Sequence, residues 1–468
     1  MSSKVPVTEA ELAELPPKIR ALISRIIDYY ERRIAELESR LNRTPQNSSL
    51  PPSAVHPHAK PAPRKPKSKR KRGGQPGHAK YQRPLIPTKD CDHVQSLKPA
   101  LCRRCGENLL GHDPTPLRHQ VWELPEIKPI VKEYQLHRLT CRGCGAKTCA
   151  QLPPGVPFGQ AGPRLVALVA LLMGCFRLSK RRVAIFLEHV LAQPCSTGWI
   201  VKLQHMATQA LRPAYEELAA SLPEQPVVKI DETPTKEGPR KSWLWTCVAE
   251  KFTLFALRPS RAATALTELL SENYGGVVHC DRARMYLSLD RLQWCWAHLR
   301  RDFQSLVDSR AAGSKYLGQR LLTNVKRLFG HWRSYRDGTI TRLALVRRMG
   351  PVRRAIEGLL ERGAASGQKT YQGMCRELHE HRQRLWTFLR ADGVEPTNNA
   401  AERALRHAVI WRKLSFGTQS SAGSRFVETI LTLIETCRQQ SRPLFAFLTK
   451  TIEHHLAGKP TPSLVANG

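Results

Sequence analysis

Long hydrophobic segments are missing from this sequence. The longest apolar run, residues 165–176, is shorter than the roughly 20 residues that a helix needs to span a bilayer, and it suits a buried helix. No apolar core follows the charged residues near the N-terminus, so we expect no signal peptide. Together these absences predict a cytoplasmic protein without a membrane partner.

Acidic residues are also scarce. The chain has 39 Asp and Glu against 74 Lys and Arg, which gives a formal net charge of +35. Such an excess indicates a polyanionic partner, most commonly nucleic acid, although a ribosome-associated or simply basic protein would share it. The 13 cysteines come without a secretory signal, which favours reduced thiols and a metal site over disulfides.

Two short apolar runs each end on an aspartate. Residues 227–230 precede Asp231, and residues 277–280 precede Asp281. Both runs predict buried strands. If the strands are parallel neighbours, the two aspartates leave the sheet side by side, where the crevice beyond strand carboxyl ends usually holds the ligand. The pattern therefore predicts half of a metal site.

Glu402 is the best candidate for the missing carboxylate. Thr397 or Asn398 can cap a helix that would carry Glu402 about one turn in. Three carboxylates could hold two Mg²⁺ or Mn²⁺ ions, which would activate water or a DNA 3′-hydroxyl and stabilise the leaving oxygen. Glu232 and Glu395 are local competitors for this role.

The segments between the acids predict a fold. Strand-like runs at 243–248 and 253–257, a helical pattern at 262–273 and a strand at 292–296 accompany the two aspartate strands. This order of elements, with acids on the first and fourth strands, is that of an RNase H-like fold. The predicted class is therefore a multidomain α+β protein with an RNase H-like catalytic domain.

Several motifs of the chain occur together in one known family. They are residues 70–78 (RKRGGQPGH), 231–234 (DETP), 295–298 (CWAH), 398–406 (NNAAERALR) and 433–437 (LIETC). In these motifs the sequence resembles the large DDE transposase of the insertion-sequence-66 family, over most of its length. The resemblance implies that Asp231, Asp281 and Glu402 are the catalytic triad, with a helical insertion before Glu402. The chain departs from the family after Asp281, where residues 282–286 (RARMY) replace a turn rich in Gly and Tyr.

Two Cys-x-x-Cys pairs predict a structural zinc site. Each pair places two thiolates on one tetrahedral ion, and four thiolates leave no position open for catalysis. The separation of the pairs, 36 positions (141 minus 105), leaves room for residues 120–136 to form a hairpin in a zinc-ribbon-like module. Reduced cysteines without metal are the alternative. The predicted ligands are Cys102, Cys105, Cys141 and Cys144, with Cys91, Cys149 and His137 as nearby substitutes.

The N-terminal region predicts a helix and then a basic linker. Residues 18–42 carry a heptad seam, which favours a coiled coil in a homo-oligomer; an amphipathic helix packed on its own chain is the alternative. Residues 43–80 have too few apolar side chains to order, and their basic arm would contact phosphates without reading sequence. The seam is Ile23, Ile27, Tyr30, Ile34, Leu37 and Leu41, and the arm is Lys69, Arg70, Lys71 and Arg72.

Two further segments predict helical modules that contact DNA. Residues 163–222 resemble a helix-turn-helix, and a plain packing module with Trp199 in its core is the alternative. Residues 303–393 are too long for a loop, so we expect a helical insertion that grips DNA with a basic face, a solvated face being the alternative. The predicted DNA-facing side chains are Trp199, Lys202, Gln204 and His205 on the last helix of the first segment, and Arg300, Arg301, Arg403, Arg406, Arg412, Lys413 and Arg425 elsewhere.

The chain is long enough for several domains. The predicted segments are an N-terminal helix (1–46), a basic disordered linker (47–90), the zinc-ribbon-like module (91–155), a helical DNA-binding domain (156–225), the two parts of the catalytic domain (226–302 and 394–440), the helical insertion (303–393) and a C-terminal helix and tail (441–468).

These patterns together predict a DNA transposase that cleaves and joins DNA at insertion-sequence ends by a DDE two-metal mechanism. Asp231 and Asp281 would hold both ions and Glu402 one. The expected partners are transposon-end and target DNA, further copies of the chain and accessory proteins of the same element. The alternatives are a non-catalytic zinc-containing DNA-binding protein or regulator derived from a transposase, and a structure-selective nuclease that cuts without joining.

Overall fold

The computed structural model of the chain describes residues 14–41, 47, 83–309 and 313–465. The chain divides into two compact units, residues 57–130 in one and residues 1–56 and 131–468 in the other. The predicted basic arm at residues 69–72 lies outside the described residues. Within the described part of the chain, no helix is both long and apolar enough to cross a membrane.

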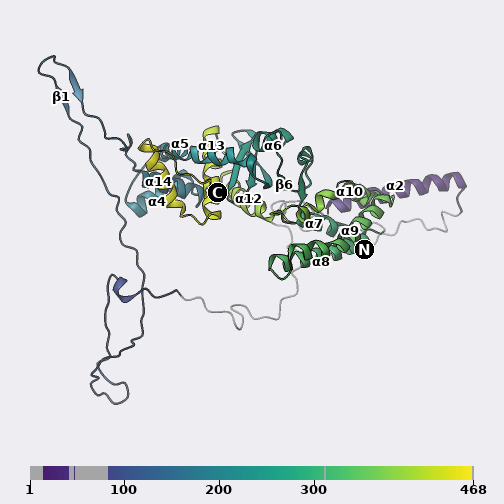
Figure 1. Cartoon of the computed structure of the whole chain (residues 1–468), viewed down its shortest axis with the longest axis horizontal. Coiled ribbons are helices and arrows are strands. Elements are labelled where there is room, and N and C mark those ends of the chain that lie inside the picture. Colours follow the sequence, from purple (N-terminus) through teal and green to yellow (C-terminus); the bar gives the residue numbers. More distant parts are fainter. Residues whose placement is uncertain (1–13, 42–46, 48–82, 310–312, 466–468) are drawn as a thin grey trace. The chain divides into compact units, whose positions relative to one another are not determined.

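A five-stranded mixed sheet organises the larger unit (Figure 1). Its strand order is β5-β4-β3-β6-β7; β3, β4 and β5 form an antiparallel meander, whereas β6 and β7 run parallel to β3. All five predicted strands form, and the first is longer than expected. The strands are β3 (Val227–Glu237), β4 (Arg240–Val248), β5 (Thr253–Arg258), β6 (Val277–Cys280) and β7 (Leu292–Trp294).

Burial explains why these runs become strands. Every residue of β6 is buried, as expected of a parallel strand covered on both faces. In β3, Val228 and Ile230 are fully buried and alternate with less buried residues, which gives the period of two of a strand with one core face. The predicted helix between the sheet strands forms as α6 (Ala263–Leu270).

Helix α13 (Ser421–Gln439) covers the edge strand β5 and satisfies its free amides. The backbone N–H of Phe255 donates to the Thr432 hydroxyl at 2.9 Å, and that of Leu257 donates to the Glu428 carboxylate at 3.1 Å. An uncovered edge strand presents unpaired backbone groups that invite aggregation. The side chains of α13 therefore close the sheet where no sixth strand follows β5.

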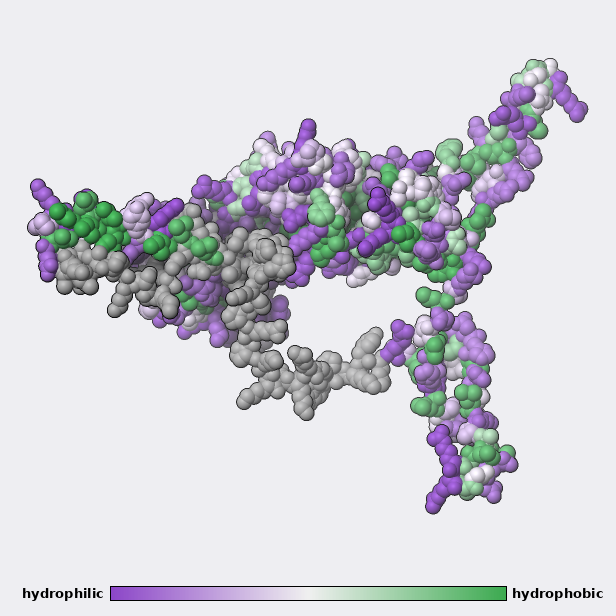
Figure 2. All heavy atoms as spheres, turned by 180° about the vertical axis from the view of Figure 1, so that it is seen from behind, coloured by the Kyte–Doolittle hydropathy of each residue, from purple (hydrophilic) through white to green (hydrophobic). Residues whose placement is uncertain are grey.

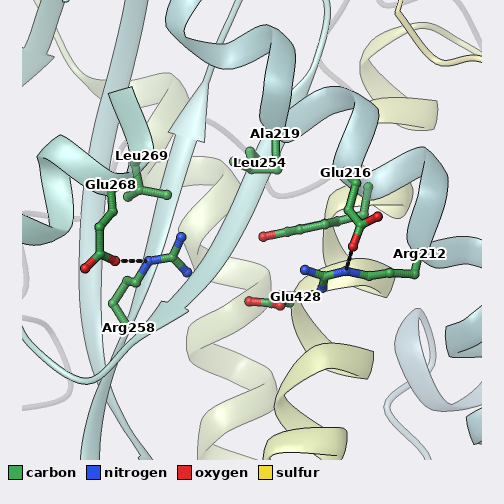
Figure 3. Close-up of a pocket in the computed structure, with 9 residues that line it drawn as sticks. Arg212, Glu216, Ala219, Leu254, Arg258, Glu268, Leu269 and Glu428 are labelled. Atoms are coloured by element: carbon green, nitrogen blue, oxygen red, sulfur yellow. Dashed lines mark hydrogen bonds and ion pairs between the residues drawn. The ribbon is translucent and has the colours of Figure 1, made fainter. Parts of the chain in front are cut away.

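Beside this edge a cavity of about 180 Å³ is lined by charged residues of α5, β5, α6 and α13. Arg212 contacts Glu428 at 2.7 Å and Glu216 at 3.0 Å, and Arg258 contacts Glu268 at 2.9 Å. Figure 3 shows the Arg212–Glu216 and Arg258–Glu268 pairs on opposite sides of the cavity. Because each arginine in its lining is paired with a glutamate, we interpret the cavity as part of the scaffold.

Four helices pack together at one end of the sheet. Helix α5 contacts α3, α4 and α13, and α14 contacts α3. Ser179 and Ser196 cap α4 and α5, since their hydroxyls accept the N–H groups of Arg182 and Trp199. The helices are α3 (Pro163–Gly174), α4 (Lys180–Leu191), α5 (Thr197–Ser221) and α14 (Leu444–Leu456).

The helix-turn-helix prediction is only partly consistent with this packing. Lys202 is exposed on α5, but Trp199 is half-buried and packs against the core. Gln204 is buried, so the expectation that it faces DNA is wrong. A DNA-contacting role for Trp199 and Lys202 stays a prediction.

The predicted helical insertion forms at the other end of the sheet (Figure 1). Its helices pack in sequence, α7 on α8, α8 on α9 and α9 on α10. The indole N–H of Trp296 donates to the carbonyl of Leu385 at 2.8 Å and fixes the end of the insertion to its beginning. The helices are α7 (Trp296–Asp308), α8 (Ser314–Arg336), α9 (Arg342–Ala365), α10 (Lys369–Glu380) and α11 (Thr387–Arg390).

The predicted N-terminal helix forms as α2 (Pro17–Leu41). Tyr30, Ile34 and Leu41 of the heptad seam are exposed in the structure, and Figure 2 shows apolar side chains on the surface of this helix. An exposed seam is what a coiled-coil partner would cover. Homo-oligomerisation stays a prediction.

Residues 120–136 do not form the predicted hairpin. They contain no strand; instead β1 (Arg138–Thr140) and β2 (Lys147–Cys149) form a short hairpin around the second cysteine pair. Two prolines, Pro125 and Pro129, interrupt the segment and cannot donate ladder hydrogen bonds. Its apolar side chains, such as Val121 and Ile130, are also exposed, so burial does not favour pairing there.

Candidate functional site

The register of the sheet aligns the two predicted catalytic aspartates. Lys229 of β3 pairs with His279 of the parallel strand β6, so two residues further on Asp231 and Asp281 lie at equivalent positions. Strand β6 ends at Cys280, and Asp281 is the first residue beyond it. The two acids therefore lie at equivalent positions of adjacent strands, but only Asp281 follows the end of its strand; β3 continues to Glu237, so the prediction that Asp231 ends its strand is wrong.

Glu402 is held beside this edge by the segment that precedes its helix. Glu402 lies in the first turn of α12 (Asn399–Ser415) and is half-buried, and α12 packs on β3 and β4. Asn398 occupies the cap position, but its side chain does not cap the helix as predicted. Its amide N–H group donates instead to the carbonyl of Ile230 at 2.7 Å, one residue before Asp231. This bond fixes the start of α12 to the aspartate strand.

The carboxylates are close enough to perturb one another. Burial raises the pKa of Asp231 well above its ordinary value, and the charges of Glu232 and Asp281 raise that pKa further. Glu402 contributes in the same direction. The charges of Asp281 and Glu402 thus both act on Asp231, and repulsion of this kind is relieved by bound cations.

Glu232, the local competitor of Asp231, already has a side-chain partner on each of its carboxylate oxygens. Arg261 contacts one carboxylate oxygen of Glu232 at 2.5 Å, and the hydroxyl of Tyr286 donates to the other at 2.5 Å. Asp231, by contrast, accepts the backbone N–H of Glu232 at 3.0 Å. Because both oxygens of Glu232 are engaged, Asp231 is the better metal ligand of the two.

The turn after Asp281 is well defined although it lacks the expected glycine. The Asp281 carboxylate accepts the N–H of Ala283 at 2.8 Å, which closes the turn locally. Arg282 then pairs with Asp302 of α7 at 2.8 Å and with Glu377 of α10 at 2.9 Å. These pairs fasten the helical insertion to the residue next to the predicted ligand.

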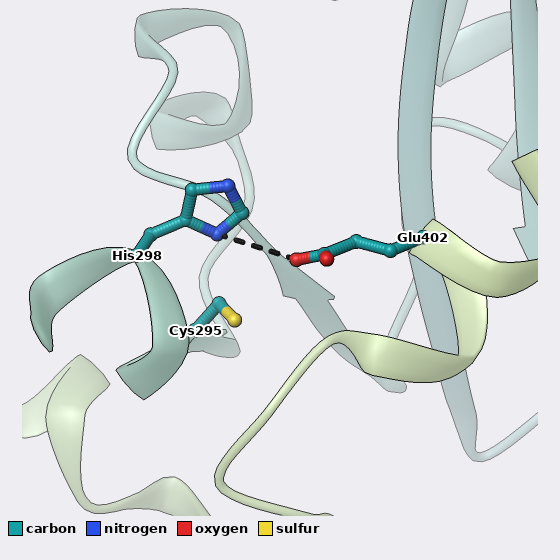
Figure 4. Close-up of side chains that lie close together, drawn as sticks. All are labelled: Cys295, His298 and Glu402. Carbon is teal, nitrogen blue, oxygen red and sulfur yellow. Dashed lines mark ion pairs between the residues drawn. The ribbon is translucent and has the colours of Figure 1, made fainter. Parts of the chain in front are cut away.

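Three residues near the site were not predicted to take part in it. Arg261 lies 3.9 Å from the Asp281 carboxylate, and Cys295 and His298 lie close to Glu402 (Figure 4). The Cys-x-x-His spacing was visible in the sequence, but its closeness to Glu402 depends on the turn before α12. The position of Arg261 had no comparable signal.

The two cysteine pairs adopt the same local turn, each within its own unit. The N–H of Gly106 donates to the carbonyl of Cys102 at 2.9 Å, and that of Gly145 donates to Cys141 at 2.9 Å. Both glycines have positive φ, near +80° and +74°. Nearby backbone N–H groups lower the pKa of Cys102 and of Cys141, which favours the thiolate that zinc requires. The four-cysteine zinc site stays a prediction.

Most of the predicted DNA-contacting cations that the structure describes are accessible. Arg301 is half-buried, and Arg412 is also half-buried and donates to the carbonyl of Pro234 in β3. Burial lowers the pKa of Arg412. Its guanidinium therefore braces α12 on the sheet, although contact with DNA is untested. The exposed cations are Arg300, Arg403, Arg406, Lys413 and Arg425.

Comparison with known proteins identifies the family. A family model described as the Transposase IS66 family matches residues 158–425, which is more than half of the 468 residues. The chain belongs to the IS66 transposase family. The matched region of this IS66 member contains the whole sheet, the insertion and all three predicted catalytic acids.

Two other similarities carry less information. Residues 4–84 match a family of unknown function, DUF6444. The chain is also 25% identical over 249 residues to an uncharacterized protein, y4qI, of Sinorhizobium fredii (strain NBRC 101917 / NGR234). That alignment covers 48% of this chain and 46% of the relative, so the chain spans less than half of the relative's length.

The raised pKa of Asp231 predicts a pH-dependent stability of the metal-free protein. The folded state binds more protons than the unfolded state between the unfolded pKa and the raised folded pKa, so stability should fall as pH rises through that window. Replacement Asp231→Asn should therefore stabilise the metal-free chain at neutral pH, and the difference should vanish at acidic pH. Thermal melts at several pH values, without and with Mg²⁺, test this; Mg²⁺ should stabilise wild type more than the variant. A variant less stable than wild type at neutral pH would contradict it.

Proposed function

We propose that this IS66 family member is a DDE transposase that cleaves and joins DNA at the ends of its element with two divalent ions. The proposal rests on one observation: Asp231 and Asp281 lie at equivalent positions of adjacent parallel strands, and the charges of Asp281 and Glu402 both raise the pKa of Asp231. Neighbouring carboxylates of this kind suit oxygen-preferring ions such as Mg²⁺ or Mn²⁺. The unpartnered Glu402 Oε1 is consistent with a missing cation.

The proposed catalytic domain has an RNase H-like fold. An antiparallel β3-β4-β5 meander followed by two strands parallel to β3 supports this proposal. The helical insertion would separate the two parts of that domain in sequence. Arg282 would connect the insertion to the catalytic strand, so that the insertion and the site move together.

Each residue of the proposed site has a role. Asp231 and Asp281 would hold both ions, and Glu402 would hold one. When bound, the ions lower the pKa of the attacking hydroxyl and stabilise the leaving oxygen of the phosphodiester. Asn398 keeps Glu402 at the aspartate strand, and the Arg261–Glu232–Tyr286 network keeps the neighbouring acid out of the ligand set.

DNA would be held largely through its phosphates. The exposed cations of α7, α12 and the start of α13 lie on elements that carry or flank the acids. Such contacts position DNA without reading its sequence, and their contribution falls with salt. The basic insertion would add further contacts.

The experiment that tests the function uses DNA carrying the ends of the element. Wild type with Mg²⁺ should cut at those ends and join the released 3′-hydroxyl to a second DNA, and both activities should disappear with chelator. Cutting without joining would favour a structure-selective nuclease. Binding without cutting would favour a regulator derived from a transposase.

A structural zinc ion would stabilise the cysteine-rich segment. We propose Cys102, Cys105, Cys141 and Cys144 as its ligands, supported by the matching turns of the two pairs. Replacement Cys105→Ser or Cys144→Ser should lower the zinc retained after dialysis by about one ion per chain, because a tetrahedral thiolate site tolerates no missing ligand. Zinc is measured by atomic emission, with Cys195→Ser, outside both pairs, as the control. Equal zinc in all variants would contradict the assignment.

A further inference from the structure

Three side chains of different chemistry converge next to the proposed catalytic site. Cys295 immediately precedes α7, His298 lies in its first turn, and Glu402 lies in the first turn of α12. One ligand atom of each lies within 4.8 Å of the other two. Figure 4 shows the imidazole and the carboxylate pointing toward each other, with the thiol below them.

Two of the three donor atoms of this cluster have no hydrogen-bond partner among the described residues. His298 Nδ1 and Glu402 Oε1 are 3.7 Å apart, too far for a hydrogen bond, and neither has a hydrogen-bond partner within the described part of the chain although both atoms are buried. The Cys295 sulfur is buried and accepts the N–H of Asn398 at 3.1 Å. Buried polar atoms without partners are costly, so their coincidence at one point indicates a missing ligand.

A second imidazole adjoins the cluster. His279 of β6 is fully buried, and neither of its ring nitrogens has a hydrogen-bond partner among the described residues. Burial, together with the charges of Lys229 and His298, lowers the pKa of His279 to about 3.

We propose that Cys295, His298 and Glu402 form a binding site for a transition-metal ion of the zinc class. Thiolate, imidazole and carboxylate are the ligands that zinc takes, whereas Mg²⁺ avoids sulfur and nitrogen. Nitrogen and oxygen ligands about 2.0–2.2 Å from a tetrahedral ion lie roughly 3.3–3.6 Å apart, so His298 Nδ1 and Glu402 Oε1, 3.7 Å apart, would move together by only a few tenths of an ångström. Binding would release the thiol proton of Cys295 to solvent and would leave one position open.

Glu402 belongs both to this metal site and to the proposed catalytic triad. The placement of the site beside a catalytic centre therefore rests on the proposed function. Its other two donors lie outside that triad. Metal binding can therefore be measured in a chain that has lost Asp231 and Asp281, where the result does not depend on whether the protein cleaves DNA.

The experiment compares zinc content in the full-length Asp231→Asn/Asp281→Asn chain. With the cluster intact, this chain should bind one more Zn²⁺ than the same chain carrying Cys295→Ser and His298→Ala. With Co²⁺ in place of Zn²⁺, the second chain should also lose the charge-transfer absorption of one thiolate. Cys375→Ser, which removes a buried thiol from α10 in the insertion, is the matched control and should change neither readout.

Equal metal content with and without the cluster, in chains of similar melting temperature, would overturn the proposal. If the Cys295→Ser/His298→Ala chain does not fold, Glu402→Gln replaces it, because the Glu402 side chain is partly exposed and its loss leaves the core packed. Glu402→Gln should weaken binding of the extra ion at least about tenfold, as expected for loss of a ligand. Unchanged affinity in Glu402→Gln would overturn the proposal as well.

Discussion

Replacement of Asp231 or Asp281 by Asn should reduce Mg²⁺-dependent cleavage of the element's ends by about a thousandfold or more. Each substitution removes a charged ligand from both proposed ions, whose stabilisation of the transition state amounts to several kcal/mol, and each 1.36 kcal/mol corresponds to about tenfold in rate. Glu402→Gln should have a similar effect. The readout is the initial rate of strand cleavage on labelled end DNA.

DNA binding should survive these substitutions. Asn keeps the size of Asp and removes a repelling charge, so the fold and the basic surface should persist, and the Kd for end DNA should change by less than about threefold. Glu395→Gln is the matched control. Glu395 is an acid that pairs at 2.7 Å with Lys229, and Lys229 lies on the same strand as Asp231. If Asp231→Asn cleaves as fast as Glu395→Gln, the two-metal assignment is wrong.

The strands and the positions of the acids could be predicted because local pattern determines them. Short runs rich in Val and Ile, such as residues 227–230 and 277–280, pair as buried parallel strands, and their register places the acid that follows each run at equivalent positions. Glu402 could be predicted only as a residue early in a helix. Its distance from the aspartates depends on the bond between Asn398 and Ile230, which no local pattern encodes.

Two of the failures have the same cause, a tertiary contact that overrides a local preference. Asn398 suits a helix cap, but it donates to a strand that lies 168 positions earlier in the chain. Gln204 suits a recognition helix, but packing of α5 against its neighbours buries it. Residues 120–136 have the composition of a hairpin, but their apolar side chains are exposed, so burial does not stabilise strand pairing there. The network around Glu232 was unpredictable because Arg261 comes from the loop before α6 and Tyr286 from a 3-10 helix after β6.

Replacement Arg261→Ala should destabilise the sheet by about 2–3 kcal/mol. Removal of one partner of a buried ion pair typically costs about 3–5 kcal/mol because the remaining charge stays buried, and the partial exposure of Arg261 reduces that cost. Glu232 is only 2% exposed and would keep Tyr286 as its one other side-chain partner. The midpoint of urea unfolding, followed by tryptophan fluorescence, measures the loss; Trp243, against which Arg261 packs at 5.2 Å, reports on this region.

Two variants decide whether the loss of stability in Arg261→Ala comes from the lost charge or from the lost packing against Trp243. Arg258→Ala removes an arginine of the same sheet whose partner, Glu268, is 60% exposed, so it should cost less than about 1 kcal/mol. Glu232→Gln combined with Arg261→Ala should recover most of the stability lost in Arg261→Ala, because no buried charge then remains unpaired. If the double variant is as unstable as Arg261→Ala, packing against Trp243 is the main contribution. In that case the ion pair between Arg261 and Glu232 would no longer explain why Asp231, rather than Glu232, is the proposed metal ligand.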